Sequence, residues 1–263
     1  MNEVNKTLYI PLYGKAAVSK KGIILQDKKA EQIWEKEGFV LKGKAKSKWL
    51  TYYMGMRSAV FDNWVKTMLE TYPEAMVLHI GCGMDSRVER IGARNRIWYD
   101  VDFPDVIEER RKYYQEDEYY HMLLADARKT DWVKQLPCCN HIIVIMEGIS
   151  MYLTHEELAH LLLTIKNYFQ NVNLLVDCYT ELAAKASKYK NPIKEVGASA
   201  TSGLDDTTYL EKRAGLKFVA EHSLTPSEMV DELHGFERWF FKHVMAGSMA
   251  KKLYRLYEYN SGI

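Results

Sequence analysis

The chain has 263 residues, of which 47% are hydrophobic, and its formal net charge at pH 7 is +1. This hydrophobic content excludes a disordered chain, and the length fits one large α/β domain or two small ones. Because nucleic-acid-binding proteins carry a clear basic excess, the charge predicts no nucleic-acid partner. Lysines do cluster between 15 and 48, where we expect them to lie on solvated helix faces.

The cysteines and the N-terminal segment indicate the cellular compartment. The four cysteines form no Cys-X-X-Cys pair, and the adjacent Cys138 and Cys139 suit neither a structural disulfide nor a zinc site. The N-terminus lacks the apolar run of a signal peptide, and no segment reaches the roughly 18 apolar residues of a membrane span. We therefore expect a soluble, cytoplasmic protein with reduced thiols, no bound metal and no membrane partner.

Residues 1–72 do not alternate between strand and helix, and we expect them to form a helical cap. A hydrophobic arm is expected at 8–13, followed by a helix from about 27 to 36. The aromatic residues at 49–53 are too dense to be left in water. Apolar residues then recur at helical spacing over 57–72. Such a cap is expected to fold back on the main domain as a lid.

The segment 76–105 predicts a nucleotide-type binding site at the edge of a parallel sheet. An apolar run of strand length, 76–80, stops at Gly81 and Gly83, where the absence of a Cβ lets the backbone pass close to a ligand. A second strand ends at Asp102, nineteen residues after Gly83. A carboxylate at that distance can accept hydrogen bonds from both ribose hydroxyls. A tight strand-to-helix turn in another kind of α/β protein is the alternative.

The glycine turn also distinguishes between two cofactors. Dinucleotide-binding proteins have a third glycine that allows close packing of helix on strand, and Ser86 stands at that position. S-adenosylmethionine has no pyrophosphate to be held at a helix N-terminus. The turn therefore favours S-adenosylmethionine, and an NAD-dependent oxidoreductase is the alternative.

Two further carboxylates follow predicted strands, at the edge where open α/β sheets bind ligands. Asp126 follows a strand predicted at 121–125, and it either accepts a hydrogen bond from an adenine amino group or caps a turn before Arg128. Glu147 follows the very apolar strand 141–146. Because a carboxylate is costly to bury unpaired, Glu147 either reaches a cleft or holds a cation.

The remainder of the chain continues the alternation of helix and strand. Thr154 and Glu157 form a capping box before an amphipathic helix, and a mobile loop over the active edge is expected at 191–206. The pattern predicts one doubly wound α/β sheet of about seven strands. The other expected elements are a strand at 172–177, a helix ending at Gly215, a strand at 217–221, a helix opened by Thr225 and Pro226, and a final edge strand at 252–259.

Three ordered motifs resemble the leucine carboxyl methyltransferase family. They are GCGMDSR from Gly81, YDVDFPDVIEERR from Tyr99 and MEGISMYLTHEEL from Met146, and the opening TLYIPLYGKAAVSK is similar to that of bacterial members. The resemblance implies a class I methyltransferase fold, which is Rossmann-like with a mostly parallel seven-stranded sheet. It places the helical cap at 1–72 and the S-adenosylmethionine-binding domain at 73–263.

The resemblance also implies roles for individual residues. Arg57 would pair with the methionine carboxylate of the cofactor, although by itself it is equally consistent with an exposed surface arginine. Asp102 would hold the ribose hydroxyls. Glu147 would lie near the methionine end and the methyl group, and Tyr152 would border the acceptor. The other residues assigned to cofactor binding are Gly81, Cys82, Gly83, Asp126 and Ala127.

The implied reaction is O-methylation of a carboxylate or a phenolic hydroxyl of a small molecule. Displacement at a sulfonium needs mainly alignment and the exclusion of water. A carboxylate, with a pKa of about 4, needs no base, whereas a phenol, with a pKa of about 10, does. His155 is the candidate base, and a surface residue at a helix start is its other interpretation. A protein that binds the cofactor without catalysis is a further alternative.

Overall fold

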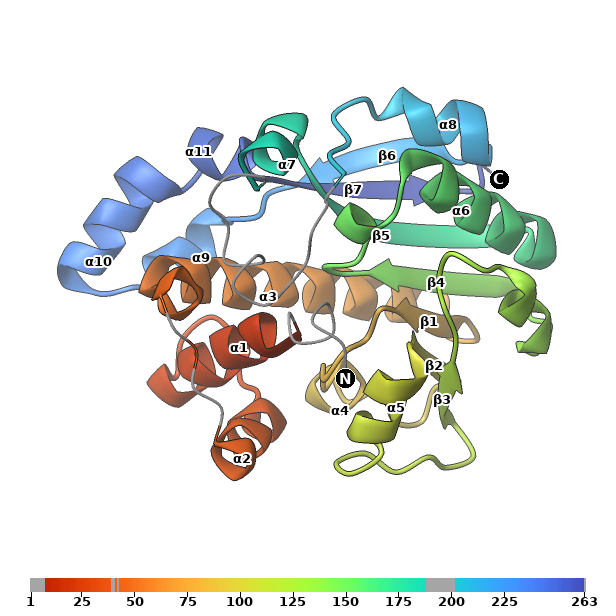
Figure 1. Ribbon diagram of the computed structural model, residues 1–263, viewed down its shortest axis with the longest axis horizontal. Helices are drawn as coiled ribbons and strands as arrows, with labels where there is room; N and C mark the ends of the chain where they lie inside the picture. Colours follow the sequence, from red (N-terminus) through yellow and green to blue (C-terminus); the bar gives the residue numbers. More distant parts are fainter. Residues whose placement is uncertain (1–7, 39–40, 42, 188–201, 263) are drawn as a thin grey trace.

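A seven-stranded sheet forms the centre of the computed structural model, which describes residues 8–38, 41, 43–187 and 202–262 (Figure 1). The predicted mostly parallel sheet is confirmed, because the first five strands run parallel. The strands are β1 (Met76–Ile80), β2 (Trp98–Asp102), β3 (Tyr120–Leu124), β4 (His141–Met146), β5 (Asn171–Tyr179), β6 (Lys217–His222) and β7 (Tyr254–Asn260).

The strand order is β3-β2-β1-β4-β5-β7-β6. It reverses direction between β1 and β4, which makes that point the switch where open α/β sheets bind ligands. The prediction that the C-terminal strand forms an edge is wrong, because β7 pairs with both β5 and β6 and is antiparallel to each. Residues 256–259 of β7 are all buried, which explains why the alternation of this strand is imperfect.

In its described residues, the segment expected to form the N-terminal cap contains the α-helices α1 (Tyr9–Lys21), α2 (Lys28–Glu37) and α3 (Lys48–Thr71) and the 3-10 helix η2 (Gly43–Lys46). The hydrophobic arm expected at 8–13 is the beginning of α1, because its apolar residues continue the helix that packs on α2 and α3. The aromatic residues at 49–53 belong to α3, so Arg57 lies in the third turn of a 24-residue helix and not at its start.

Most of the remaining helices flank the sheet, whereas α10 lies beyond the end of the strands (Figure 1). Proline opens α5 (Pro104–Arg110), and the capping box of Thr154 and Glu157 opens α6 (His155–Phe169), the latter as predicted. Gly215 ends α8 in the left-handed conformation at a φ of 64°, also as predicted. These helices are α4 (Arg87–Arg90), α5 (Pro104–Arg110), α6 (His155–Phe169), α7 (Glu181–Ser187), α8 (Thr208–Ala214), α9 (Ser227–Asp231), α10 (Gly235–Phe240) and α11 (Ser248–Lys251).

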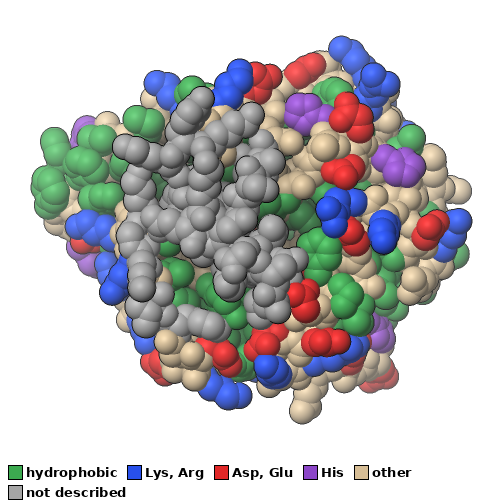
Figure 2. All heavy atoms as spheres, viewed as in Figure 1, with side chains coloured by type: hydrophobic (Ala, Val, Ile, Leu, Met, Phe, Trp, Pro, Cys, Tyr) green, Lys and Arg blue, Asp and Glu red, His purple; other side chains and the backbone are tan. Residues whose placement is uncertain are grey.

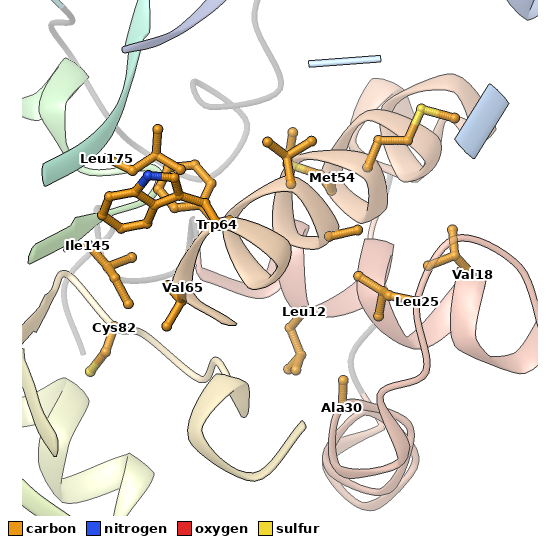
Figure 3. Packing of buried hydrophobic residues seen from close by; sticks show 14 of the residues in the cluster. Leu12, Val18, Leu25, Ala30, Met54, Trp64, Val65, Cys82, Ile145 and Leu175 are labelled. Atoms are coloured by element: carbon orange, nitrogen blue, oxygen red, sulfur yellow. The ribbon is translucent and has the colours of Figure 1, made fainter. Parts of the chain in front are cut away.

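Two hydrophobic cores lie on opposite faces of the sheet. Alternate residues of β4 enter different cores: Ile143 and Ile145 face α3, and Ile142 and Val144 face α6. The cap shares its core with the sheet, so α3 is held directly against the strands. Residues of this shared core are Leu12 and Val18 of α1, Trp64 and Val65 of α3, Ile145 of β4 and Leu175 of β5 (Figure 3).

On the face shown in Figure 2, the described residues carry acidic and basic side chains interspersed with one another. None of the described helices combines the length and the apolar character that a membrane crossing requires. Of the loop expected at 191–206, residues 191–201 lie outside the described residues. Gly203, at its described end, forms a parallel β-bridge with Tyr179.

Candidate active site

A cavity of about 460 Å³ lies at the edge of the sheet where β1, β2, β4 and β5 end and β7 begins. Its opposite side is formed by α1 and α3 of the cap. The volume is within the range of about 300 to 1,000 Å³ found for small-molecule sites. Nine of the ten residues that the sequence analysis assigned to the site line this cavity. They are Arg57, Gly81, Cys82, Gly83, Asp102, Asp126, Ala127, Glu147 and Tyr152.

The turn after β1 requires glycine for two physical reasons. Gly81 and Gly83 have φ angles of 72° and 51°, which side chains rarely tolerate. A Cβ on Gly81 would also lie 2.8 Å from two atoms of Ile149. Cys82 between them is buried, and this burial raises the pKa of its thiol well above the ordinary value. The turn therefore presents backbone and a neutral thiol to the cavity.

Asp102 is held in a fixed orientation at the end of β2. Its Oδ2 accepts a hydrogen bond from the Gly83 amide at 2.8 Å, and its Oδ1 accepts one from the Phe103 amide at 2.8 Å. Burial raises the pKa of Asp102 to about 6, although these two hydrogen bonds oppose the shift. Each carboxylate oxygen can accept a second hydrogen bond. Asp102 can therefore receive two donors from the cavity.

Asp126 caps the turn before Arg128, which is one of the two roles considered from the sequence, and the contact with an adenine stays a prediction. It lines the cavity, and its Oδ1 also accepts hydrogen bonds from the Arg128 amide at 3.0 Å and from Arg128 Nε at 2.9 Å. The hydrogen bond from the Arg128 side chain lowers the pKa of Asp126. Asp126 is therefore an ionised turn cap at the rim of the cavity, next to the buried Ala127.

Glu147 is buried at the end of β4 and both reaches the cavity and holds cations. Its Oε1 accepts hydrogen bonds from Arg57 Nε at 3.0 Å and from Ser58 Oγ at 2.8 Å, and its Oε2 pairs with Arg87. Burial by itself would raise the pKa of Glu147, but Arg87 and Arg57 together lower it to about 2. Glu147 is therefore an anion at neutral pH, not a proton acceptor.

Arg57 is buried in α3, which excludes the exposed surface position considered from the sequence. Besides Glu147, it contacts Asp177 Oδ2 through Nη1 at 2.8 Å. Burial disfavours the charged arginine, but Asp177 and Glu147 raise its pKa above the ordinary value. Gly148 has a φ of 75°, and a Cβ there would lie 3.2 Å from Arg57 Nη2, so glycine leaves room for the guanidinium group.

The sequence analysis missed several charged residues of the site, among them Asp177 and Lys15. Asp177 is the last residue of the predicted strand 172–177. Like Asp102 and Glu147, it is an acid at the carboxyl end of a predicted strand, and this pattern could have identified it from the sequence. Lys15 was expected on a solvated helix face, but it is 3% exposed, lines the cavity and contacts Asp85 at 3.1 Å. The expectation failed for Lys15 because helix α1 had not been recognised.

His155, the tenth assigned residue, is not among those that line the cavity. It is the first residue of α6, and its Nε2 lies 2.8 Å from the carbonyl oxygen of Gly203, which accepts the hydrogen bond. Its position is that of a partly buried helix-start residue. Tyr152, which precedes it in a short 3-10 turn (Ser150–Tyr152), does line the cavity.

In the described parts of the chain, no group of three or more His, Cys, Asp or Glu side chains is arranged to hold a metal ion.

Comparison with known sequences gives one family and two named relatives. Residues 7–166 match the leucine carboxyl methyltransferase family. The chain is 30% identical over 185 residues to the tetracenomycin polyketide synthesis O-methyltransferase of Streptomyces glaucescens, covering 70% of this chain and 68% of the relative. It is 27% identical over 237 residues to an S-adenosyl-L-methionine-dependent methyltransferase of Gibberella zeae, covering 81% and 80%.

Solved structures with the same fold include two methyltransferases. A putative methyltransferase from Thermobifida fusca has a TM-score of 0.57 and 12% identity, covering 94% of this chain and 93% of the other. The magnesium protoporphyrin IX methyltransferase of Synechocystis, solved with bound S-adenosylhomocysteine, has a TM-score of 0.51 and 10% identity, covering 88% and 92%. At these identities the likeness concerns the fold alone, and it confirms the predicted class I methyltransferase fold.

Glu147→Gln is expected to lower the free energy of unfolding by about 3 kcal/mol or more, because it leaves two buried guanidinium groups short of a carboxylate. The measurement is urea denaturation followed by circular dichroism. Glu156→Gln, at an exposed position in the first turn of α6, is the matched control and should change stability by less than about 0.5 kcal/mol. A loss below about 1 kcal/mol for Glu147→Gln would mean that the other carboxylates satisfy both arginines without it.

Proposed function

The chain belongs to the leucine carboxyl methyltransferase family, and we propose that it methylates a carboxylate oxygen of a small molecule. It is an S-adenosylmethionine-dependent methyltransferase, as the family and both relatives confirm. This result decides between the two cofactors that the glycine turn left open. The class of acceptor and the roles of individual residues are the proposed part.

The assigned residues follow the order of the strands along the cavity. Neighbouring strands are about 4.8 Å apart, so successive strand ends can contact successive parts of an extended ligand. We assign the adenine to Asp126 and Ala127 beyond β3, the ribose hydroxyls to Asp102 at β2, and the methionine carboxylate to the cations Arg57 and Lys15. This assignment is supported by the fixed orientation of Asp102 and by the position of both cations in the cavity wall.

The bound cofactor would supply an electrophilic methyl group on a sulfonium. A carboxylate oxygen of the acceptor would form a bond to the methyl carbon, while the electron pair of the breaking carbon–sulfur bond would remain on sulfur. The products are a methyl ester and S-adenosylhomocysteine, and no proton moves. The residues of this chain would align the two reactants in the cavity, and Glu147 would place a negative charge at the end of β4 next to the sulfonium.

The observation that carries the carboxylate proposal is the pairing of the ionisable side chains in the cavity wall. Glu147 has a pKa of about 2 and contacts two arginines. Both ring nitrogens of His79 have partners: Nδ1 lies 3.3 Å from Asp100 Oδ1, and Nε2 lies 3.5 Å from Arg87 Nη1. His155 is outside the cavity wall. A phenol would need a base to take its proton, whereas a carboxylate is already ionised. The relative from Streptomyces is named an O-methyltransferase, which supports an oxygen acceptor.

The acceptor class can be tested with labelled S-adenosylmethionine and a panel of carboxylic acids and phenols. For a carboxylate acceptor we expect kcat/KM to stay constant between about pH 7 and pH 9, because the acceptor is ionised throughout. A phenol would instead show a rise of about tenfold per pH unit toward its pKa of about 10. Methylation of phenols alone, with such a rise, would contradict the proposal. Cofactor binding without transfer to any acceptor would indicate a catalytically silent binding protein.

The role of Asp102 predicts a pH dependence of cofactor binding. Because the ionised carboxylate accepts two hydroxyl donors and its pKa is about 6, affinity should be high above that pH and decline below it. Calorimetric titration with S-adenosylhomocysteine should show affinity about tenfold weaker near pH 5 than near pH 7. Asp102→Asn should bind weakly at both values and show no such change. Equal affinities of the unmodified protein at both pH values would exclude Asp102 as the ribose ligand.

A further inference from the structure

We propose that the end of the cavity formed by β5 and β7 is an acceptor subsite for an aromatic carboxylic acid, with Tyr179 and Tyr254 as its wall. This inference rests on the proposed methylation of a carboxylate and specifies the class of acid. It uses part of the cavity that the cofactor assignment leaves unused. Both tyrosines line the same cavity as the glycine turn.

The position of the subsite follows from the strand order. With the ribose at β2 and the methionine carboxylate near Arg57, the reacting methyl group would lie close to the end of β4. The next strands along the same edge are β5 and β7, so an acceptor that approaches the methyl group from the far side must contact them. Tyr179 is the last residue of β5, and Tyr254 is the first residue of the antiparallel β7.

The walls of this end are apolar and aromatic. The two tyrosines form a small cluster with Met151, with Tyr152 packed against it. On the cap side, Leu50 and Met54 precede Arg57 by seven and three residues in α3, so they lie on the same face of the helix and also line the cavity. A flat apolar ring with one charged substituent fits such walls, because the ring can pack there while its carboxylate reaches the methyl group at the end of β4.

The two tyrosines form a rigid pair. They are register partners of β5 and β7, with ring centroids 4.7 Å apart and planes at 72°, and the Tyr254 hydroxyl donates a hydrogen bond to the Tyr179 hydroxyl at 3.2 Å. The Arg57 guanidinium carbon lies 5.7 Å from the centroid of the Tyr254 ring. Tyr254 is the more accessible of the two, because Tyr179 is only 7% exposed. A ring held in this way loses little conformational freedom when a ligand binds.

The test compares an aromatic and an aliphatic acid of similar size, 1-naphthoate and decanoate. Binding of each to the protein saturated with S-adenosylhomocysteine is measured by calorimetry, and kcat/KM is measured for each. Tyr254→Leu should weaken the binding of 1-naphthoate and lower its kcat/KM, each by about 3- to 10-fold, which is the range that an aromatic contact contributes. The same substitution should change the affinity and kcat/KM for decanoate by less than about twofold. Tyr254→Phe should retain the preference for the aromatic acid. Tyr119→Leu, a partly exposed tyrosine outside the cavity wall, is the matched control.

Three results would overturn the subsite: no loss in Tyr254→Leu, an equal loss for both acids, or failure of the unmodified protein to prefer 1-naphthoate. Weaker binding of S-adenosylhomocysteine by the folded variant would also overturn it, because Tyr254 would then border the cofactor. If 1-naphthoate binds with the expected dependence on Tyr254 but is not methylated, the subsite stands and the proposed reaction fails.

If Tyr254→Leu does not fold, a second variant tests the subsite. Leu50→Trp, in the cavity wall on the cap side, should exclude 1-naphthoate without changing cofactor affinity. Unchanged binding of 1-naphthoate would overturn the proposal.

Discussion

The buried ion pairs around Glu147 connect the helices α1 and α3, the turn after β1, and the ends of β4 and β5. Arg57 comes from α3, Arg87 from the helix after the glycine turn, and Glu147 from the end of β4. The same network reaches α1 of the cap through Asp85 and Lys15. Charges buried without partners are strongly destabilising, so these elements can occupy their observed positions only together. The network therefore fixes the cap against the sheet and gives the cavity its shape.

This network also limits the chemistry of the site. Arginine partners keep Glu147 ionised, so it contributes a fixed charge and does not transfer protons. Asp102 differs, because burial outweighs its two amide hydrogen bonds and the charge of Arg110 and raises its pKa to about 6, and its carboxylate can still accept hydrogen bonds. A cavity with fixed charges at one end and aromatic side chains at the other is suited to aligning two reactants. Such a site is consistent with an acceptor that arrives already ionised.

Local signals in the sequence predicted the parts of the site that depend on local structure. Apolar strands, the glycine turn and the acids that follow strands identified Asp102 and Glu147 at one edge of the sheet. Contacts between distant segments were not available to such reasoning. The insertion of β7 between β5 and β6, the burial of Arg57, and the ion pair of Lys15 all depend on residues far away in the chain. The aromatic wall was missed for the same reason, because Tyr179 and Tyr254 meet only when β5 and β7 pair.

A crystal structure with S-adenosylhomocysteine tests the central claim, which is the orientation of the cofactor along the strand ends. The account predicts both ribose hydroxyls within about 3.2 Å of the Asp102 carboxylate. The cofactor sulfur should lie beside Glu147 and Gly148 and face the cavity end formed by Tyr179 and Tyr254. An adenine bound between those tyrosines, or a ribose without contact to Asp102, would contradict the account.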